Sequence, residues 1–484
     1  MEATLSTSVK NIPISPNTKL EEILRTFDAQ QKNRQAVKNT SAKQRIAKLK
    51  KLVDVTQKYR TQIEDAVYAD LHKPAVETAY AEIYNVVAEC RHAIENLNDW
   101  AAPHPVDTPL LFVGSSSEIL FEPKGVALII TPWNYPFQMP VQHLVAAVAA
   151  GCTVMVKPSE FTPHTSAVVK KILTEVFPEN EVAVIEGDHS VSTELLKLNF
   201  DHIHFTGSPA VGKVVMHAAA EHLTSVTLEL GGKSPVIIDD TANIDAAAKK
   251  LTWGKFLNCG QTCIAPDYIL IDEKKQAEFI AKLTANIKKV FGEDVEKSPD
   301  ISHIINNRHF NRIKGLYNDA VKRGAKVEIG GQMDEANNFI APTVLSNVSL
   351  DSKIMQEEIF GPLLPVISYK AQDDALKIIN GKEKPLSLYI FSGKQKNQDY
   401  WLNNTTAGGT CINDNLVHIS QPNLPFGGVN NSGIGKSFGF FGFKEFSNER
   451  GVLKALHSSS VVRPLWQPYG KLARLVTNLM IKYL

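Results

Sequence analysis

From residue 117 onward, the chain alternates short apolar runs with longer segments that have the periodicity of helices. Five such runs lie at residues 127–130, 153–156, 181–185, 202–205 and 235–238. Each run is apolar on both faces, which is typical of parallel strands that helices cover from both sides. The alternation therefore predicts an α/β protein built on a doubly wound parallel sheet.

A second series of strands and helices begins near Gly231, with no low-complexity linker between the two series. Its predicted elements are helices over 244–258, 275–291 and 307–323, and strands over 268–271 and 326–329. A chain of 484 residues would hold about three domains at roughly 150 residues each. Because the two series adjoin, we expect two α/β units that share one compact body.

The region before the first sheet is predicted to be helical. Residues 1–16 are polar and are expected to form a loose lead-in. Capping-box patterns that start at Thr18 and Ser41 predict the beginnings of two helices, and a third helix is expected over 77–100.

Charge and cysteine content exclude several classes of protein. Lysine and arginine number 52 against 51 aspartates and glutamates, so the net charge is +1 and we expect no nucleic-acid partner. Five cysteines are too few and too odd in number for a disulfide framework, and their spacing predicts no metal site. The N-terminal residues lack a signal-peptide core, and the apolar stretch 139–156 reads as a buried helix that runs into a strand. We therefore expect a cytoplasmic protein.

Cys263 stands in a small, polar, turn-prone segment that contains glycine, glutamine and threonine. The cysteine thiolate is the strongest ordinary side-chain nucleophile near neutral pH, so Cys263 is a candidate catalytic residue. Cys90, Cys152 and Cys411 lie in apolar or helical surroundings and are interpreted as ordinary core residues. Cys259 is either a small residue that lines the pocket or the partner of Cys263 in a reversible disulfide.

Glu229 lies between two leucines and is followed by two glycines, which is a poor setting for a solvated carboxylate. A carboxylate in apolar surroundings has a raised pKa and can act as a general base. The same pattern fits a structural glutamate that is paired with a buried cation, and the residues alone leave both interpretations open.

Two loops follow predicted strands and could contact a ligand. The segment 205–213 places a glycine turn between a strand and a helix, where free N–H groups suit a pyrophosphate, although it is not the G-x-G-x-x-G fingerprint. Asn134 lies between Pro132 and Pro136, directly after the strand 127–130. Ligands bind at the carboxyl ends of such strands, and an amide there could stabilise an oxyanion.

Seven short motifs, in a fixed order, carry a resemblance to a known family. They read TPWNYP at 131–136, KPSE at 157–160, FTGS at 205–208, LELGGK at 228–233, GQTC at 260–263, EEIFGP at 357–362 and PFGG at 425–428. Over roughly residues 20–455, the chain resembles the NAD(P)-dependent aldehyde dehydrogenase superfamily. The residues after Cys263 and the segment 426–435 are similar to the class 3 branch, which acts on fatty and aromatic aldehydes.

The resemblance implies a reaction and the residues that perform it. Cys263 would attack the aldehyde carbon, and the amide of Asn134 and the N–H of Cys263 would hold the resulting oxyanion. Hydride would pass to the nicotinamide, and Glu229 would activate the water that hydrolyses the thioester. The implied cofactor-binding residues are Trp133, Lys157, Ser159, Glu160, Gly207, Ser208, Gly212, Glu358 and Phe360.

The expected substrate is a medium- or long-chain aliphatic aldehyde or an aromatic one. NAD is expected to be preferred, because Glu160 would hydrogen-bond a free 2′-hydroxyl and repel a 2′-phosphate, while Lys157 would let NADP be accepted. Two alternatives are an aldehyde dehydrogenase that transfers the acyl group to coenzyme A, and a non-catalytic structural protein on the same fold. Glu229 argues against the first alternative, and the intact set of Cys263, Glu229 and Asn134 argues against the second.

By resemblance, the fold is the aldehyde dehydrogenase fold, with a Rossmann-like cofactor domain, an α/β catalytic domain and a β-hairpin oligomerisation arm. The implied boundaries are a cofactor domain over 17–102 and 123–230, a catalytic domain over 231–412, and an arm with a bridging segment over 103–122 and 413–460. In the arm, residues 110–113 and 119–121 are predicted to pair as a hairpin. A homodimer is expected, because exposed strand edges are usually paired or protected.

The C-terminal segment 461–484 is predicted to contain an amphipathic helix from residue 471 onward. Leu472, Leu475 and Leu479 lie on its apolar face, and cationic side chains lie on the other face. The helix would cap its own body or a dimer partner, make weak peripheral contact with a membrane, or cover the substrate entrance. A cap is the favoured interpretation.

Overall fold

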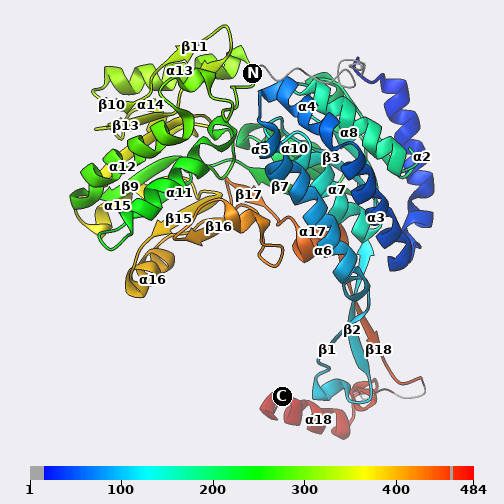
Figure 1. Ribbon diagram of the computed structural model, residues 1–484. Coiled ribbons are helices and arrows are strands. Elements are labelled where there is room, and N and C mark those ends of the chain that lie inside the picture. Colours follow the sequence, from blue (N-terminus) through cyan, green and yellow to red (C-terminus); the bar gives the residue numbers. More distant parts are fainter. Residues whose placement is uncertain (1–15, 458–459, 461, 484) are drawn as a thin grey trace.

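The computed structural model describes residues 16–457, 460 and 462–483. Two α/β halves lie beside each other, and an arm of antiparallel strands extends away from them (Figure 1). The predicted lead-in lies outside the described residues as far as residue 15. The α/β prediction is confirmed.

The first sheet has six strands, in the order β17-β7-β6-β3-β4-β5. They are β3 (Val126–Ile130), β4 (Thr153–Lys157), β5 (Val182–Val184), β6 (His202–Gly207), β7 (Ser225–Leu230) and β17 (Gly433–Ile434). All are parallel except β17, which pairs antiparallel with β7. The chain order reverses between β3 and β6, and ligands of open α/β sheets bind at the carboxyl ends of strands at such a switch point.

Helices cover both faces of this sheet, as expected for strands that are apolar on both sides. They include α7 (Gln138–Ala150), α8 (Pro163–Val176), α9 (His189–Leu195) and α10 (Pro209–Ala220). Every residue of α7 is buried, so the apolar stretch 139–156 is a core helix followed by β4, as predicted. Within the described part of the chain, no helix combines the length and apolar character needed to cross a membrane.

The second sheet has seven strands, in the order β10-β13-β14-β9-β8-β15-β16. They are β8 (Pro235–Ile238), β9 (Tyr268–Asp272), β10 (Lys326–Ile329), β13 (Thr343–Ser346), β14 (Leu363–Tyr369), β15 (Ser387–Phe391) and β16 (Gly409–Ile412). Only β10 runs antiparallel to its neighbour. The covering helices include α11 (Ile244–Phe256), α12 (Glu273–Phe291), α13 (Asn307–Lys322), α15 (Gln372–Asn380) and α16 (Gln395–Asn404).

The N-terminal helices pack beside the first sheet. They are α2 (Leu20–Lys38), α3 (Ala42–Lys58), α4 (Arg60–Leu71) and a continuous run of α5 (Ala75–Thr78), the π-helical turn η1 (Ala79–Ile83) and α6 (Tyr84–Trp100). The capping box at Ser41 forms as predicted, with both reciprocal hydrogen bonds. The one predicted at Thr18 is wrong, because the Thr18 hydroxyl donates instead to the carbonyl of Glu186 and α2 begins without a side-chain cap.

The arm consists of β1 (His104–Val106), β2 (Ser116–Pro123) and β18 (Ser447–Lys454), with β2 in the centre. The predicted strand at 110–113 is wrong, because Leu110–Phe112 forms a 3-10 turn in which Leu110 is exposed. An apolar run alone cannot distinguish a strand from an exposed turn. The predicted C-terminal helix forms as α18 (Lys471–Tyr483) and lies at the far end of the arm (Figure 1).

Candidate active site

A cavity of about 240 Å³ opens at the carboxyl ends of β6 and β7 and meets segments of the second half of the molecule. Cys263, Glu229 and Asn134 all line it, although they come from three separate segments of the chain. The same cavity is lined by other predicted site residues: Trp133, Gly207, Ser208, Glu358 and Phe360. The fold thus brings eight of the predicted residues to one place.

Cys263 is held by a sharp bend after α11. Asn258, Cys259 and Gly260 have φ angles of 50°, 54° and 72° in succession, so the chain turns instead of continuing as a helix. A Cβ on Gly260 would lie 2.3 Å from the carbonyl oxygen of Gly361, so only glycine fits there. The bend directs Cys263 into the cavity, where its side chain is partly exposed.

The protein environment around Cys263 favours the neutral thiol. Burial beneath the protein surface raises the pKa of the Cys263 thiol to about 12, and the carboxylates of Glu358 and Glu229 add to this rise. The backbone N–H groups of Cys263 and Ile264 oppose it by hydrogen bonding to the sulfur. A positive charge brought into the cavity would therefore favour the reactive thiolate.

Cys259 does not share this environment. Its side chain is completely buried in the core of the second half, and its sulfur lies 3.9 Å from the carbonyl oxygen of Ile340. Burial raises the pKa of the Cys259 thiol above its ordinary range. Cys259 is therefore a core residue, and the interpretation that it lines the pocket is wrong.

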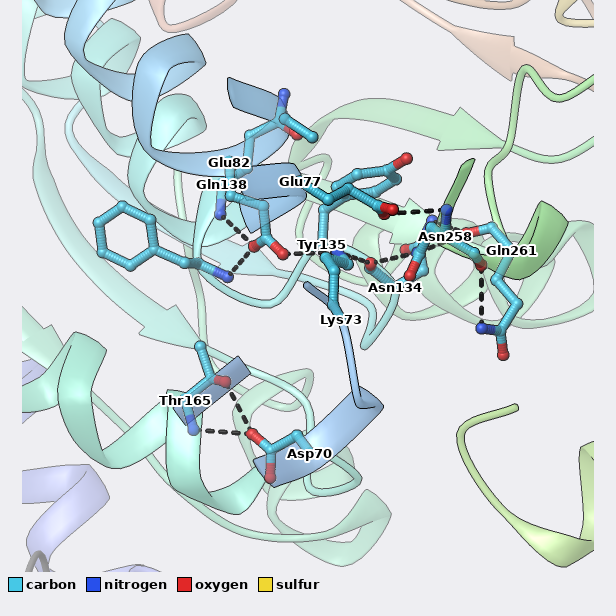
Figure 2. Close-up of polar contacts among 12 residues, drawn as sticks. Asp70, Lys73, Glu77, Glu82, Asn134, Tyr135, Gln138, Thr165, Asn258 and Gln261 are labelled. Atoms are coloured by element: carbon cyan, nitrogen blue, oxygen red, sulfur yellow. Dashed lines mark hydrogen bonds and ion pairs between the residues drawn. The ribbon is translucent and has the colours of Figure 1, made fainter. Parts of the chain in front are cut away.

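Asn134 lies in the loop between β3 and α7 and is buried. Its side-chain amide donates a hydrogen bond of 3.0 Å to the carbonyl of Gln261, two residues before Cys263. The amide of Asn258 donates in turn to the carbonyls of Asn134 and Gln261, at 2.7 and 3.1 Å (Figure 2). These bonds join the Asn134 loop to the Cys263 loop, and one amide hydrogen of Asn134 is left for a ligand.

Glu229 lies on β7 and is also buried. The Ser437 hydroxyl donates a hydrogen bond of 2.6 Å to its Oε1, whereas Oε2 has no partner among the described residues. Burial raises the pKa of Glu229 to about 8, and the contact with Ser437 and the charge of Lys436 oppose the rise. A carboxylate with one free oxygen and a pKa near neutrality is suited to take a proton from water.

The end of β6 and the start of α10 form a cradle for an anion. Ser208 is the N-cap of α10 and Pro209 is its first residue, so N–H groups of the first helical turn face the cavity edge. Gly212 does not line the cavity: a Cβ there would lie 2.8 Å from a methyl group of Leu230, so glycine lets α10 pack closely on β7. This close helix–strand packing is what a dinucleotide-binding α/β unit requires beside its phosphate site.

A neighbouring pocket of about 160 Å³ lies beyond the end of β4. Ser159 and Glu160 line it, and Lys157 Nζ forms an ion pair of 2.9 Å with Glu160 Oε2. The structure thus brings Lys157, Ser159 and Glu160 together, and β3 separates β4 from β6, the strand that leads to the cradle at Ser208.

Glu358 and Phe360 form the opposite wall of the main cavity. Glu358 lies directly against the backbone of Gly231, where a Cβ would be 2.1 Å from Glu358 Oε2. Burial raises the pKa of Glu358 to about 8. Phe360 packs edge-to-face on Trp133, with ring centroids 5.4 Å apart. Carboxylates, helix-start N–H groups and aromatic rings are thus arranged as a dinucleotide with a nicotinamide end would require.

A second, apolar cavity of about 170 Å³ reaches Cys263 from the other side. It shares Met139 and Cys263 with the main cavity. Its further apolar lining residues include Tyr80, Tyr135, Trp253, Leu257, Leu416 and Ile419. Two cavities that meet at one thiol can hold two reactants, one on each side of the sulfur.

Several site residues were missed from the sequence. Ser437 contacts Glu229 across 208 residues, and Lys73 and Glu82 contact the Asn134 loop across 61 and 55 residues. For Glu82 the sequence offers one indication. It stands four residues before the buried Val86, so it lies on the inward face of a predicted helix, where a carboxylate is unusual. For Ser437 and Lys73 no local sequence pattern indicates a role.

Comparisons with known proteins agree with this geometry. The aldehyde dehydrogenase family profile matches residues 7–452. AldX of Bacillus subtilis (strain 168) is 47% identical over 435 residues, which are 89% of this chain and 97% of the relative. The rat protein named "Aldehyde dehydrogenase, dimeric NADP-preferring" is 43% identical over 86% of this chain and 91% of its own length.

The solved structure described as the substrate-bound state of Staphylococcus aureus AldH superposes with a TM-score of 0.90. It is 40% identical and covers 95% of this chain and 99% of its own chain. The resemblance of the seven motifs to a known family is thereby confirmed. The chain belongs to the aldehyde dehydrogenase family and is an NAD(P)-dependent enzyme that oxidises aldehydes to carboxylic acids.

Proposed function

We propose that Cys263 is the nucleophile of aldehyde oxidation, that Asn134 holds the oxyanion, and that Glu229 is the general base. The observation that carries this proposal is the convergence of the three side chains on one cavity. The free Oε2 of Glu229 and the free amide hydrogen of Asn134 support these roles, because each is a group that a reactant could occupy.

The Cys263 sulfur forms a bond to the aldehyde carbon, and the carbonyl oxygen becomes an oxyanion that the Asn134 amide and the Cys263 N–H stabilise. Departure of the hydride with its electron pair re-forms the C=O bond and leaves a thioester on Cys263. Glu229 then takes a proton from water, whose oxygen attacks the thioester and displaces the sulfur. A water-activating carboxylate at this place favours hydrolysis over transfer of the acyl group to coenzyme A.

The dinucleotide would lie along the carboxyl edge of the first sheet, and when bound it accepts the hydride. Ser208 and Gly207 would hold its pyrophosphate at the start of α10, and Gly212 would keep that helix close to β7. Glu358 would hold the nicotinamide ribose, with Trp133 and Phe360 packed beside the ring. The adenosine ribose would be held by Lys157, Ser159 and Glu160.

NAD is proposed as the preferred cofactor, with NADP also accepted. Glu160 would accept a hydrogen bond from a free 2′-hydroxyl and would repel a 2′-phosphate. Its ion pair with Lys157 weakens the repulsion, and the name of the rat relative supports use of NADP within the family.

The substrate is proposed to be a medium- or long-chain aliphatic aldehyde or an aromatic aldehyde. The apolar side chains of the second cavity support this class, because they offer a long hydrocarbon or a ring a dry surface that leads to Cys263.

A homodimer that forms through the arm is proposed as the working assembly. Among the described residues, the outer strands of the arm sheet, β1 and β18, each have an unpaired edge, and Leu110 and Val113 are exposed beside them. The word "dimeric" in the rat relative's name supports the same assembly. Sedimentation at micromolar concentration should give a dimer, and a monomer alone would overturn this part of the proposal.

The C-terminal helix α18 is proposed to make weak peripheral contact with membranes. Leu472, Leu475 and Leu479 are all exposed on it, whereas Ala473 is its buried side chain. The predicted apolar face is therefore not used to cap its own subunit.

A cytoplasmic location is proposed, because all five cysteines are free.

A single-turnover assay tests the proposed chemistry. Cys263→Ala should give no burst of NADH, because no thiohemiacetal can form. Glu229→Gln should keep the burst but turn over slowly, because the base acts after the hydride has left. If the Glu229→Gln variant lost the burst, Glu229 would instead be needed to activate Cys263.

A further inference from the structure

A buried ion pair lies directly against the loop that carries Asn134 (Figure 2). Lys73 Nζ is 2.6 Å from Glu82 Oε1, and both side chains are completely excluded from solvent. Such a pair adds little net stability over apolar side chains of similar size, because the cost of desolvation offsets the attraction. The position of the Lys73–Glu82 pair beside the Asn134 loop therefore points to a role other than stabilising the fold.

Lys73 holds the beginning of the loop. It follows α4, and its ammonium group donates a hydrogen bond of 3.0 Å to the backbone carbonyl of Asn134. The same ammonium lies 4.2 Å from the centroid of the Tyr135 ring, within the range of a cation–π contact. Both contacts are made to the residue that carries the amide and to the residue after it.

Glu82 holds the end of the same loop. Its Oε2 accepts hydrogen bonds from the backbone N–H groups of Phe137 and Gln138, at 2.8 and 3.2 Å. These N–H groups belong to the start of α7, where a carboxylate is favoured by the helix dipole. The ion pair thus joins two clamps, one on the carbonyl of Asn134 and one on the amides three and four residues later.

The side chain of Asn134 depends on this brace, because it has few constraints of its own. Within the described part of the chain its amide makes one hydrogen bond, to Gln261, and in the proposed role the remaining hydrogen must reach an oxyanion that exists only during the reaction. An oxyanion donor works only if it is held at hydrogen-bond distance beforehand. A small displacement of a reacting group is enough to cost a large factor in rate.

We propose that Lys73 and Glu82 are positioning residues that fix the Asn134 amide for the oxyanion. This inference rests on the proposed role of Asn134. Neither residue lines the main cavity or the second, apolar cavity, so both act through the loop between β3 and α7.

A double-mutant cycle on the rate of the NADH burst tests the proposal. Asn134→Ala should slow the burst by about 10²- to 10³-fold, as for the loss of one oxyanion donor. Lys73→Met should slow it by about 10- to 100-fold in the native background, within the factor that one such donor supplies. In the Asn134→Ala background, Lys73→Met should have almost no further effect, because the group that it positions is gone.

Two further variants keep the test interpretable. Lys73→Met leaves the Glu82 carboxylate unpaired, so the Lys73→Met/Glu82→Gln double variant removes both charges while keeping an acceptor for the helix amides. The double variant should fold, and it should show the same dependence on Asn134.

Arg45→Met is the matched control, because Arg45 is another buried cation that holds the far end of α7, through the carbonyls of Ala149 and Ala150. It should lower the melting temperature without changing the burst rate.

The outcomes distinguish the positioning role of Lys73 and Glu82 from the proposed role of Asn134. Equal slowing by Lys73→Met with and without the Asn134 side chain would overturn the positioning role, and so would an Arg45→Met variant that slowed the burst as much. A burst that survived Asn134→Ala within tenfold would overturn the proposed role of Asn134 itself. Binding of NAD, measured by fluorescence titration, should be unchanged in the Lys73 variants.

Discussion

The Ser437 hydroxyl donates a hydrogen bond of 2.6 Å to Oε1 of Glu229, and the other oxygen of this carboxylate faces no described partner. The same hydroxyl lies 3.1 Å from Nε2 of His204. Since its one proton is given to Glu229, Ser437 accepts from an Nε2–H of His204. Burial lowers the pKa of His204 to about 3, so this ring stays neutral and the chain of donors points toward the carboxylate.

The first prediction concerns the pH dependence of turnover. The proposed base Glu229 could accept a proton only when it is deprotonated, and its pKa is raised to about 8. Steady-state turnover limited by thioester hydrolysis should therefore rise as the pH increases through this value and become constant above it. The amplitude of the NADH burst should not follow this titration. A flat profile of turnover across this range would mean that Glu229 is not the base.

The second prediction uses Ser437 to move that titration. The contact with Ser437 lowers the pKa of Glu229, so Ser437→Ala should shift the midpoint of the turnover profile to higher pH. Ser437→Thr keeps a hydroxyl and should leave the midpoint near that of the native enzyme. Stopped-flow measurements should find the burst intact in both variants. An unshifted midpoint in the alanine variant would show that the hydrogen bond does not tune the base.

A third prediction concerns the choice between NAD and NADP. Glu160→Gln removes the charge that would repel a 2′-phosphate and leaves Lys157 to attract it, so kcat/KM with NADP should rise relative to NAD by about tenfold. Glu181→Gln is the matched control, because Glu181 is paired with Lys48 at the start of β5. This control removes one carboxylate from the same half of the molecule. The ratio of kcat/KM with NADP to kcat/KM with NAD should stay unchanged. A native enzyme that already prefers NADP would contradict the assignment of Glu160.

Much of the fold follows from the sequence, because most of it is local pattern. The predicted bounds of the strands β3, β4, β6 and β8 agree with the structure to within one or two residues. Short runs that are apolar on both faces and alternate with helical segments are typical of buried parallel strands. The strand β7, which carries Glu229, was not predicted, because its serine, threonine and glutamate interrupt the apolar pattern. The arm was misassigned, because β2 pairs with β18, more than 300 residues later.

The residues of the candidate site also fall into two groups, those that a local pattern identifies and those that it does not. Cys263, Asn134 and Glu229, which line one cavity, could be selected as candidates from the sequence because each stands in a motif whose neighbours are unusual for a surface or a core. Lys73, Glu82 and Ser437 could not be assigned a role, because what they do depends on a hydrogen bond to a residue far along the chain. Local patterns reveal a candidate reacting group more readily than the residues that contact it from distant parts of the chain.

The fourth prediction concerns Cys259. Its sulfur lies toward the carbonyl of Ile340, in the core of the second half, while Cys263 faces the cavity. The bend between them carries three successive left-handed residues, so the two sulfurs point to different environments. Peroxide treatment that oxidises Cys263 should therefore give no crosslink to Cys259, as read by mass spectrometry of the native protein. Recovery of a Cys259–Cys263 disulfide would show that this bend opens in solution.

The last prediction concerns α18. Leu472, Leu475 and Leu479 form an exposed apolar face, and the helix carries three cationic side chains, Lys471, Arg474 and Lys482. Each cation contributes about 1 kcal/mol near an anionic surface, so binding to vesicles that contain phosphatidylserine should be weak and should decline steeply with added salt. Truncation after Pro468 should abolish co-sedimentation with such vesicles.

Two single substitutions separate membrane contact from the other roles of α18. Leu475→Glu and Asn478→Glu each add one negative charge to an exposed position, but only the first removes an apolar side chain. Leu475→Glu should therefore release the protein from vesicles far more than Asn478→Glu, with the kinetics for short aldehydes unchanged in both. If truncation instead dissociated the dimer in sedimentation, the apolar face would be covered by the partner subunit, and if it altered only the preference for long aldehydes, the helix would lie over the substrate entrance.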